Sequence, residues 1–237
     1  RISPEGGLPP VEKLPPVTEQ LEESIARVGR RFKVKRFMAY FNDYSATYAP
    51  VERLRTLYTE ALAVRNVVGL AVGTRPDCLP ADVLDLLADL ARKTTLWVEL
   101  GLQSATPETL ERIGRKHTVA EFENAVCALA ARGIWVCAHV ILGLPEETTT
   151  HYRKTAALLS ALPISGVKIH NLHILRGSRW ESEYGAGRIR VPTLAEHTDA
   201  VVDFLKRIPS RVVVHRLMGD APRKWLVAPP WCLEQQK

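Results

Sequence analysis

Residues 96–104 read Leu96-Trp97-Val98-Glu99-Leu100-Gly101-Leu102-Gln103-Ser104, and a helix signal, Thr106-Pro107-Glu108-Thr109, follows almost at once. The apolar start of this stretch predicts a buried strand, and the polar side chains stand at its C-terminal end. In a protein built of βα repeats, that is the end at which ligands bind. A carboxylate accepts hydrogen bonds, and an amide both donates and accepts them, so the stretch predicts a polar binding site.

The rest of the chain alternates between two periodicities. Apolar runs predict strands over 37–41, 67–72, 96–100, 134–142, 167–170 and 212–214, and amphipathic helical spacing separates them. Gly133 follows one of these helices as a C-cap glycine does. Continuous apolar strands covered by helices predict a parallel α/β sheet, either doubly wound or closed into a full or partial barrel. A barrel is favoured because no G-x-G-x-x-G or P-loop motif follows a strand.

Composition narrows the function classes. The chain has 237 residues, 46% hydrophobic and 24% charged, and no apolar run long enough to span a membrane. Its net charge of +6 permits an anionic partner such as RNA, although the one basic cluster, 30–36, is equally explained as a solvated helix end. The four cysteines lack C-x-x-C spacing and predict neither a metal site nor a disulfide framework. Free thiols suit a reducing cytoplasm.

Polar residues mark the C-terminal ends of the other predicted strands as well. The candidates to face a substrate are Arg75, Asp77, His139, Lys168, His170 and His173. Each has a plainer explanation: Arg75 and Asp77 suit a surface turn held by its own ion pair, and His139 suits a hydrogen-bonded core histidine. Five such ends on one face favour a site, because barrel enzymes build their sites there.

Several of these motifs together resemble a known family. Glu99-Leu-Gly-Leu-Gln-Ser, Arg115-Lys-His-Thr and His139-Val-Ile-Leu-Gly-Leu-Pro-Glu-Glu-Thr resemble motifs of the radical SAM (S-adenosylmethionine) enzymes. The chain is most similar to the YhcC-like group of uncharacterised radical SAM proteins, which is similar in turn to the catalytic subunit of elongator, a protein that acts on tRNA. Further matches are 39–41, 47–52, 73–79, 168–173, 215–217, 219–222 and 228–231.

The resemblance implies an α/β fold, a partial (β/α)6 TIM-like barrel of the radical SAM type with its first strand and cluster loop missing. The family's cysteine motif is expected upstream of Arg1, so no residue of this chain is expected to bind the metal of the 4Fe-4S cluster. The chain by itself is therefore expected to be inactive. Residues 1–15 are predicted to be an irregular lead-in, 16–190 the barrel, and 191–237 a helix-strand extension packing on it.

The resemblance also implies roles for single residues. Glu99 is expected to accept a hydrogen bond from the amino group or ribose of S-adenosylmethionine, and Arg115 to pair with its carboxylate. Gln103 is expected to orient either group, and Ser104 belongs to the same cofactor-binding strand end. The next strand end is expected to flank the adenine through Val140, Ile141 and Leu142.

One position departs from the family pattern. Glu146 stands where glycine is usual in the Gly-Leu-Pro-Gly-Glu motif. The turn at this position must either avoid a left-handed backbone or be strained.

Three functions stay open at this stage. The first is part of a radical SAM enzyme, which with an upstream iron-sulfur segment and an electron donor generates a 5′-deoxyadenosyl radical. The second is a tRNA-binding or tRNA-modifying protein, suggested by the basic charge and the elongator likeness. The third is a cluster-free barrel that acts as a binding or scaffold module.

Overall fold

The computed structural model describes residues 15–42 and 44–236. The predicted lead-in falls almost wholly outside these residues. The helices are α1 Val17–Phe32, α2 Val51–Ala63, α3 Ala81–Ala91, α4 Pro107–Arg112, α5 Val119–Ala130, α6 Thr149–Ala161, α7 Arg179–Gly185 and α8 Leu194–Leu205, with short 3-10 turns at η2 Pro76–Cys78 and η3 Pro230–Gln236. The strands are β1 Phe37–Phe41, β2 Val67–Thr74, β3 Thr95–Gln103, β4 Trp135–Leu142, β5 Gly166–Asn171, β6 Ile174–Leu175, β7 Val213–Arg216 and β8 Leu226–Ala228.

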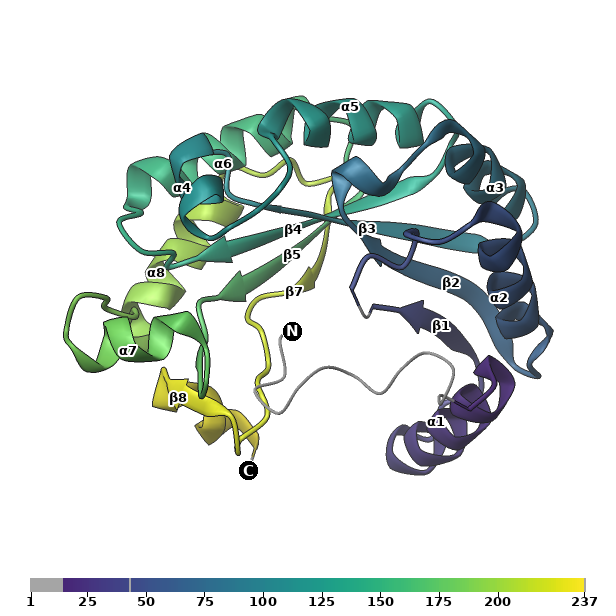
Figure 1. The fold of residues 1–237 in the computed structure, drawn as a ribbon, viewed down its shortest axis with the longest axis horizontal. Helices are drawn as coiled ribbons and strands as arrows, with labels where there is room; N and C mark the ends of the chain where they lie inside the picture. Colours follow the sequence, from purple (N-terminus) through teal and green to yellow (C-terminus); the bar gives the residue numbers. More distant parts are fainter. Residues whose placement is uncertain (1–14, 43, 237) are drawn as a thin grey trace.

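Within the described residues, six parallel strands form one curled sheet in the order β1-β2-β3-β4-β5-β7. Figure 1 shows α2, α3, α5 and α6 on the convex side of the sheet. On the concave side, α1 lies at one end and β8 at the other. This is the predicted α/β half-barrel, and all six predicted strands are present. The predicted 191–237 segment supplies β7, which pairs with β5 and is an edge strand of the six-stranded sheet. A small antiparallel pair of β6 and β8 was not predicted, because strands of two and three residues leave no periodicity.

The hydrophobic core lies between the convex face of the sheet and the helices. On β3, Val98 and Leu100 are fully buried there, and Phe122 of α5 packs in the same cluster. Because side chains alternate across a strand, the neighbours Glu99 and Gly101 belong to the concave face. The burial of each large apolar side chain contributes roughly 1.5–3 kcal/mol, so the convex face holds the fold together and leaves the concave face available for polar groups.

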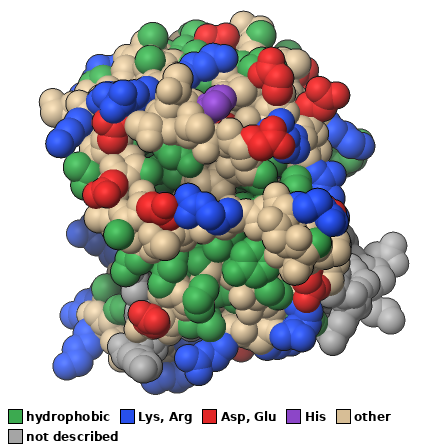
Figure 2. Space-filling view, turned by 90° about the vertical axis from the view of Figure 1, so that its left-hand side faces the viewer, with side chains coloured by type: hydrophobic (Ala, Val, Ile, Leu, Met, Phe, Trp, Pro, Cys, Tyr) green, Lys and Arg blue, Asp and Glu red, His purple; other side chains and the backbone are tan. Residues whose placement is uncertain are grey.

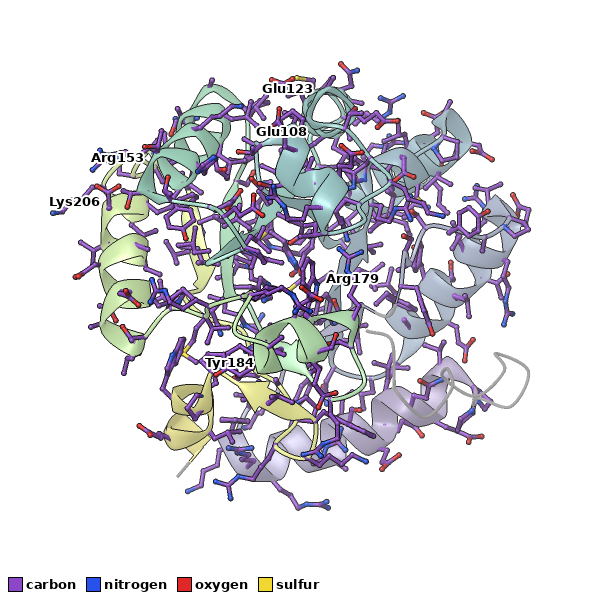
Figure 3. The ribbon with its side chains drawn as sticks, turned by 60° about the vertical axis from the view of Figure 1, so that its left-hand side comes forward. Glu108, Glu123, Arg153, Arg179, Tyr184 and Lys206 are labelled. Carbon is purple, nitrogen blue, oxygen red and sulfur yellow. The ribbon has the colours of Figure 1, made fainter. Side chains whose placement is uncertain are left out.

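Helix ends match local sequence signals. Gly133 has a φ of +70°, as the predicted C-cap requires. Thr118 and Glu121 form a capping box at the start of α5. Arg153 of α6 pairs with Asp203 of α8, with 3.0 Å between Nε and Oδ2, and Figure 3 shows Arg153 and Lys206 on the same side of the molecule. Over the described residues no helix combines the length and the apolar character needed to cross a membrane.

Candidate functional site

A cavity of about 720 Å³ opens at the C-terminal ends of β1 to β4. It lies at the edge where the sequence predicted a site. Its walls include predicted residues from three strand ends and from the segment after α4. The lining residues used below are Arg75, Asp77, Glu99, Gly101, Gln103, Arg115 and His139.

Gly101 is the floor of this cavity at the end of β3. A Cβ atom at this position would lie 2.5 Å from Nε2 of Gln103 and 2.7 Å from Nη2 of Arg115. Both atoms are the far ends of flexible side chains, so a residue larger than glycine would push the Gln103 amide and the Arg115 guanidinium out of their present positions. Gln103 has a φ of +73°, a left-handed conformation that costs a non-glycine residue about 1 kcal/mol or more. The Gln103 amide and the Arg115 guanidinium thus both lie over Gly101, which has no side chain.

The Arg115 guanidinium is left with unused donors. Nη2 donates to the carbonyl oxygen of Gly101 at 3.2 Å, while Nε is buried and has no hydrogen-bond partner among the described residues. Burial lowers the pKa of Arg115, the nearby Arg75 lowers it further, and Asp77 opposes both. The group still stays charged at neutral pH. No described carboxylate lies within 4.0 Å of it, so this partly buried cation has no direct counterion among the described residues.

Glu99 has the opposite environment. Lys168 of β5 donates to both of its carboxylate oxygens at 2.6 Å, and Nε2 of His139 on β4 lies 2.8 Å from Oε2. Tyr40 of β1 donates to Oε2 at 2.5 Å, and its ring lies 4.8 Å from the Lys168 ammonium. Glu99 is 4% exposed. Three strands therefore deliver donors to one buried carboxylate, which we call the Glu99 cluster (Tyr40, Glu99, His139 and Lys168).

The electrostatics follow from these contacts. Burial would raise the pKa of Glu99, but the hydrogen bonds and charges of His139, Lys168 and Tyr40 hold it at about 2. Burial raises the pKa of Tyr40, and the neighbouring carboxylate raises it further. Burial lowers the pKa of His139 and outweighs the attraction of Glu99. At neutral pH the cluster contains one carboxylate, one ammonium, a neutral phenol and a neutral imidazole.

The structure separates two groups of predicted residues. Gln103 and Arg115 converge at Gly101, and Arg115 keeps an N–H without a described partner, whereas Glu99 is already bonded to Lys168 and His139. Tyr40 and Gly101 were not predicted as site residues. The signal that could have found them is the alternation of the strands, which places both on the same face as Glu99.

The other cofactor-binding candidates lie close by but point elsewhere. Ser104 is buried and donates to Glu147 in the loop before α6, and it accepts from the backbone N–H of Thr106 at 3.1 Å. Val140 and Leu142 are buried in the hydrophobic core on the convex side, so only their backbone is available to a ligand. Ile141 lies on the other face of β4 and is partly exposed. Their contact with adenine stays a prediction.

The substrate candidates divide between the cavity and the segment beyond it. Arg75 and Asp77 pair with 2.9 Å between Nε and Oδ1, which confirms the ion pair, and both line the cavity. The His170 ring lies beside that of His139, with 5.2 Å between ring centroids and 38° between ring planes. Burial lowers the pKa of His170 to about 3. His173 lies farther along, with Nε2 3.6 Å from the thiol of Cys232.

The turn after β4 answers the question raised by Glu146. This residue adopts a φ of +67°, so the left-handed backbone is kept although glycine is replaced. Its carboxylate pairs with Nη2 of Arg112 at 2.6 Å, which ties the turn to α4. Arg112 is held in turn by Arg179 of α7, labelled in Figure 3, which donates to its carbonyl oxygen.

The described residues do not form a ligand set for an iron-sulfur cluster. Within 15–42 and 44–236, no three His, Cys, Asp or Glu side chains are grouped to hold a metal ion. The cysteines are spread over η2, α5, β4 and η3. Cys137 faces Glu99, and burial raises its pKa to about 12, which disfavours the thiolate that iron would need. The N–H donors of Gln103 and Arg115, which converge at Gly101, in contrast fit an amino-acid carboxylate.

Comparison with known proteins adds three findings. The family model for the radical SAM superfamily matches residues 10–159, and the model for the Radical_SAM C-terminal domain matches 164–237. YtqA of Bacillus subtilis and YhcC of Escherichia coli are each 39% identical to the chain, over 88% and 91% of it. The chain spans 65% and 69% of the length of these two relatives.

Among solved structures, the archaeal Methanocaldococcus infernus Elp3 with an N-terminal deletion superposes with a TM-score of 0.71. The match covers 89% of this chain and 54% of that one, at 19% sequence identity. At this identity the likeness shows the shared fold.

Proposed function

Because the chain belongs to the radical SAM superfamily, we propose that the cavity at the ends of β1 to β4 binds S-adenosylmethionine, as part of an enzyme that carries out radical chemistry. The observation that carries this proposal is the partly buried Arg115 guanidinium, whose buried Nε has no described partner and which lies over Gly101 beside Gln103 without a described counterion. A buried, unpaired cation is costly unless a ligand supplies an anion. The carboxylate of S-adenosylmethionine is such an anion.

The residues of this chain would divide the binding as follows. Arg115 pairs with the carboxylate through its free N–H groups, a charge-assisted contact. Gln103 donates and accepts toward the amino group or the ribose hydroxyls. Gly101 keeps the space open, since any side chain would displace both partners.

When bound beside a reduced iron-sulfur cluster, S-adenosylmethionine would provide the radical that abstracts a hydrogen atom from a carbon of the substrate. The described residues hold no ligands for that cluster, so they act in binding and in shaping the interior. The Glu99 cluster lies on the concave face, and two of its members, Glu99 and His139, line the cavity. Its one carboxylate and one ammonium group balance each other in charge. Such a cluster stays ordered without an external ion, because every group in it has a partner.

The proposal is tested by calorimetric titration of the chain with S-adenosylmethionine. Arg115→Ala is expected to weaken binding about 10- to 100-fold, the value of one or two charge-assisted hydrogen bonds. Arg132→Ala is the matched control, because Arg132 contacts only Asp85 and the carbonyl oxygen of Ala128 among the described residues and does not line the cavity.

A second ligand isolates the contact. 5′-Methylthioadenosine has the same nucleoside but no amino-acid carboxylate, so Arg115→Ala should leave its affinity unchanged. Equal losses for the two ligands would mean that Arg115 supports the shape of the cavity and does not bind the carboxylate. Absence of binding of S-adenosylmethionine to the wild-type chain would contradict the proposal and favour a scaffold role.

RNA binding is a second candidate, supported by the net charge of +6 and the exposed basic segment 30–36 at the end of α1. The face shown in Figure 2 instead mixes positive and negative side chains around a hydrophobic area, so it offers no continuous basic surface. If the 30–36 segment binds tRNA, affinity should fall steeply with salt, and joint replacement of Lys33, Lys35 and Arg36 by alanine should reduce that slope. Salt-independent or absent binding would exclude it.

A further inference from the structure

His139 and Glu99 form a carboxylate–imidazole pair on neighbouring strands. Nε2 of His139 lies 2.8 Å from Oε2 of Glu99, and the His139 side chain is 16% exposed. The same carboxylate is anchored by Lys168 at both oxygens and by Tyr40. It therefore cannot turn away from His139, and the imidazole ring is held in one orientation.

The contact settles which ring nitrogen of His139 carries the proton. Glu99 is ionised at neutral pH, since its pKa is about 2, so its oxygens only accept hydrogen bonds. The donor must therefore be Nε2–H. Because burial lowers the pKa of His139, the ring is neutral, and Nδ1 keeps its lone pair.

The Nδ1 atom of His139 is free of hydrogen bonds to the described residues. It is also not among the described side-chain atoms that are buried without a partner. The His139 ring also lines the cavity that Gly101, Gln103 and Arg115 share. The lone pair is thus accessible next to the place proposed for the cofactor.

We propose that the barrel interior contains a proton-accepting site, in which Nδ1 of His139, oriented by Glu99, receives a hydrogen bond and then the proton of a substrate O–H or N–H group. The inference rests on the proposed function only in placing the substrate beside the cofactor. In the transfer, the O–H or N–H bond breaks and its electron pair stays on the substrate. A new N–H bond forms at Nδ1, and the resulting imidazolium lies against the Glu99 carboxylate.

The neighbours of His139 indicate the class of substrate. Lys168 of β5 and Arg216 of β7 disfavour a positive charge on His139, whereas Glu99 of β3 favours it. His170 of β5 and Tyr40 of β1 are neutral at pH 7. A cationic substrate would be repelled by the positive charges of Lys168 and Arg216. The site therefore takes a neutral donor, such as an alcohol, an amide or the N–H of a heterocycle, and the anion formed on proton loss gains from Lys168 and Arg216.

Nitrogen-15 NMR of the histidine rings in the full chain tests the arrangement without any turnover. At pH 7, His139 is expected as the neutral Nε2–H tautomer, assigned by the loss of its signals in His139→Gln. An Nδ1–H tautomer or an imidazolium at pH 7 would overturn the proposal. Glu99→Gln is expected to lower the apparent pKa of His139 further, because the anion that favours the imidazolium is removed. If this variant fails to fold, the wild-type tautomer still decides the matter.

Accessibility of Nδ1 is measured by acylation with diethyl pyrocarbonate, mapped by mass spectrometry. His139 is expected to react more slowly than the partly exposed His151 of α6 but measurably faster than His197, which is buried and contacts the carbonyl oxygen of Leu217. A His139 as inert as His197 would contradict the proposal. Arg115→Ala should leave both tautomer and reactivity unchanged even where it abolishes cofactor binding, so the two proposals fail separately.

Discussion

Glu99 and Gln103 lie four residues apart on the same strand, yet their surroundings are opposite. Glu99 is buried and has donors from three neighbouring strands, so its charge is fully compensated. Gln103, with Arg115, lies at the rim of the cavity, where a buried guanidinium N–H has no described partner and the backbone is strained. The difference shows that a polar residue at a strand end indicates a ligand only when the fold leaves its hydrogen bonds unfilled.

The two groups of residues should also differ in whether they contribute to folding stability or to ligand binding. The Glu99 cluster satisfies its polar groups internally, so losing a member should harm folding. The Gly101, Gln103 and Arg115 group is incomplete without a ligand, so losing a member should harm affinity and affect folding little. Four changes test this division, and they are given in order of decreasing expected effect.

Lys168→Met should cause the largest loss of stability. It keeps the length of the side chain but leaves the Glu99 carboxylate buried without its ammonium, which costs about 3–5 kcal/mol. Urea unfolding measures this loss. Arg153→Met removes a surface pair with Asp203 as a control and should cost less than about 1 kcal/mol. Similar losses for the two variants would mean that Glu99 is not desolvated.

Acid should weaken the folded state through Glu99. The pKa of this group is lowered from 4.5 to about 2 in the folded protein, so its contribution is complete above pH 4.5 and is lost as pH falls toward 2. Each pH unit in that window removes at most about 1.4 kcal/mol. Urea unfolding of wild type and Glu99→Gln between pH 7 and 3 separates this component. Parallel pH profiles for the two proteins would refute it.

Gly101→Ala should weaken S-adenosylmethionine binding about 10-fold or more while the chain stays folded. The added methyl group displaces the Gln103 amide and the Arg115 guanidinium, and overpacking of this kind costs about 1–3 kcal/mol. Titration calorimetry gives the affinity. Gly185→Ala is the control, because a Cβ there has no neighbour within 4 Å. Unchanged affinity in Gly101→Ala would remove Gly101 from the site.

Glu146→Gly should have the smallest effect, a gain in stability of up to about 1 kcal/mol. Glycine adopts the observed φ of +67° without strain, although the ion pair with Arg112 is lost. Glu146→Ala loses the ion pair but keeps the strained backbone, and it should be less stable than Glu146→Gly. Thermal unfolding of the two variants tests the assignment, and equal midpoints would argue against strain at this turn.

Much of the fold could be predicted because it depends on local periodicity. Val98 and Leu100 alternate with Glu99 and Gly101, so the apolar and the polar face of β3 are readable from the chain. Gln103 and Arg115 were each expected, by resemblance to the family, to contact one cofactor, but their convergence at Gly101 is visible only in the structure. The β6–β8 pair and the use of Ser104 as a link to Glu147 were not predicted, because they join short segments distant in the chain.

The sequence by itself determined which residues face the inside of the half-barrel and which end of the sheet is polar, because alternation and helix signals act over a few residues. The tertiary structure decided which of those polar residues meet. Glu99 lies 40 residues from His139 and 69 from Lys168, and only the register of β3, β4 and β5 brings the three together. That register depends on packing across the whole sheet, including a shift between Gly101 and Gln103, so no local pattern records it.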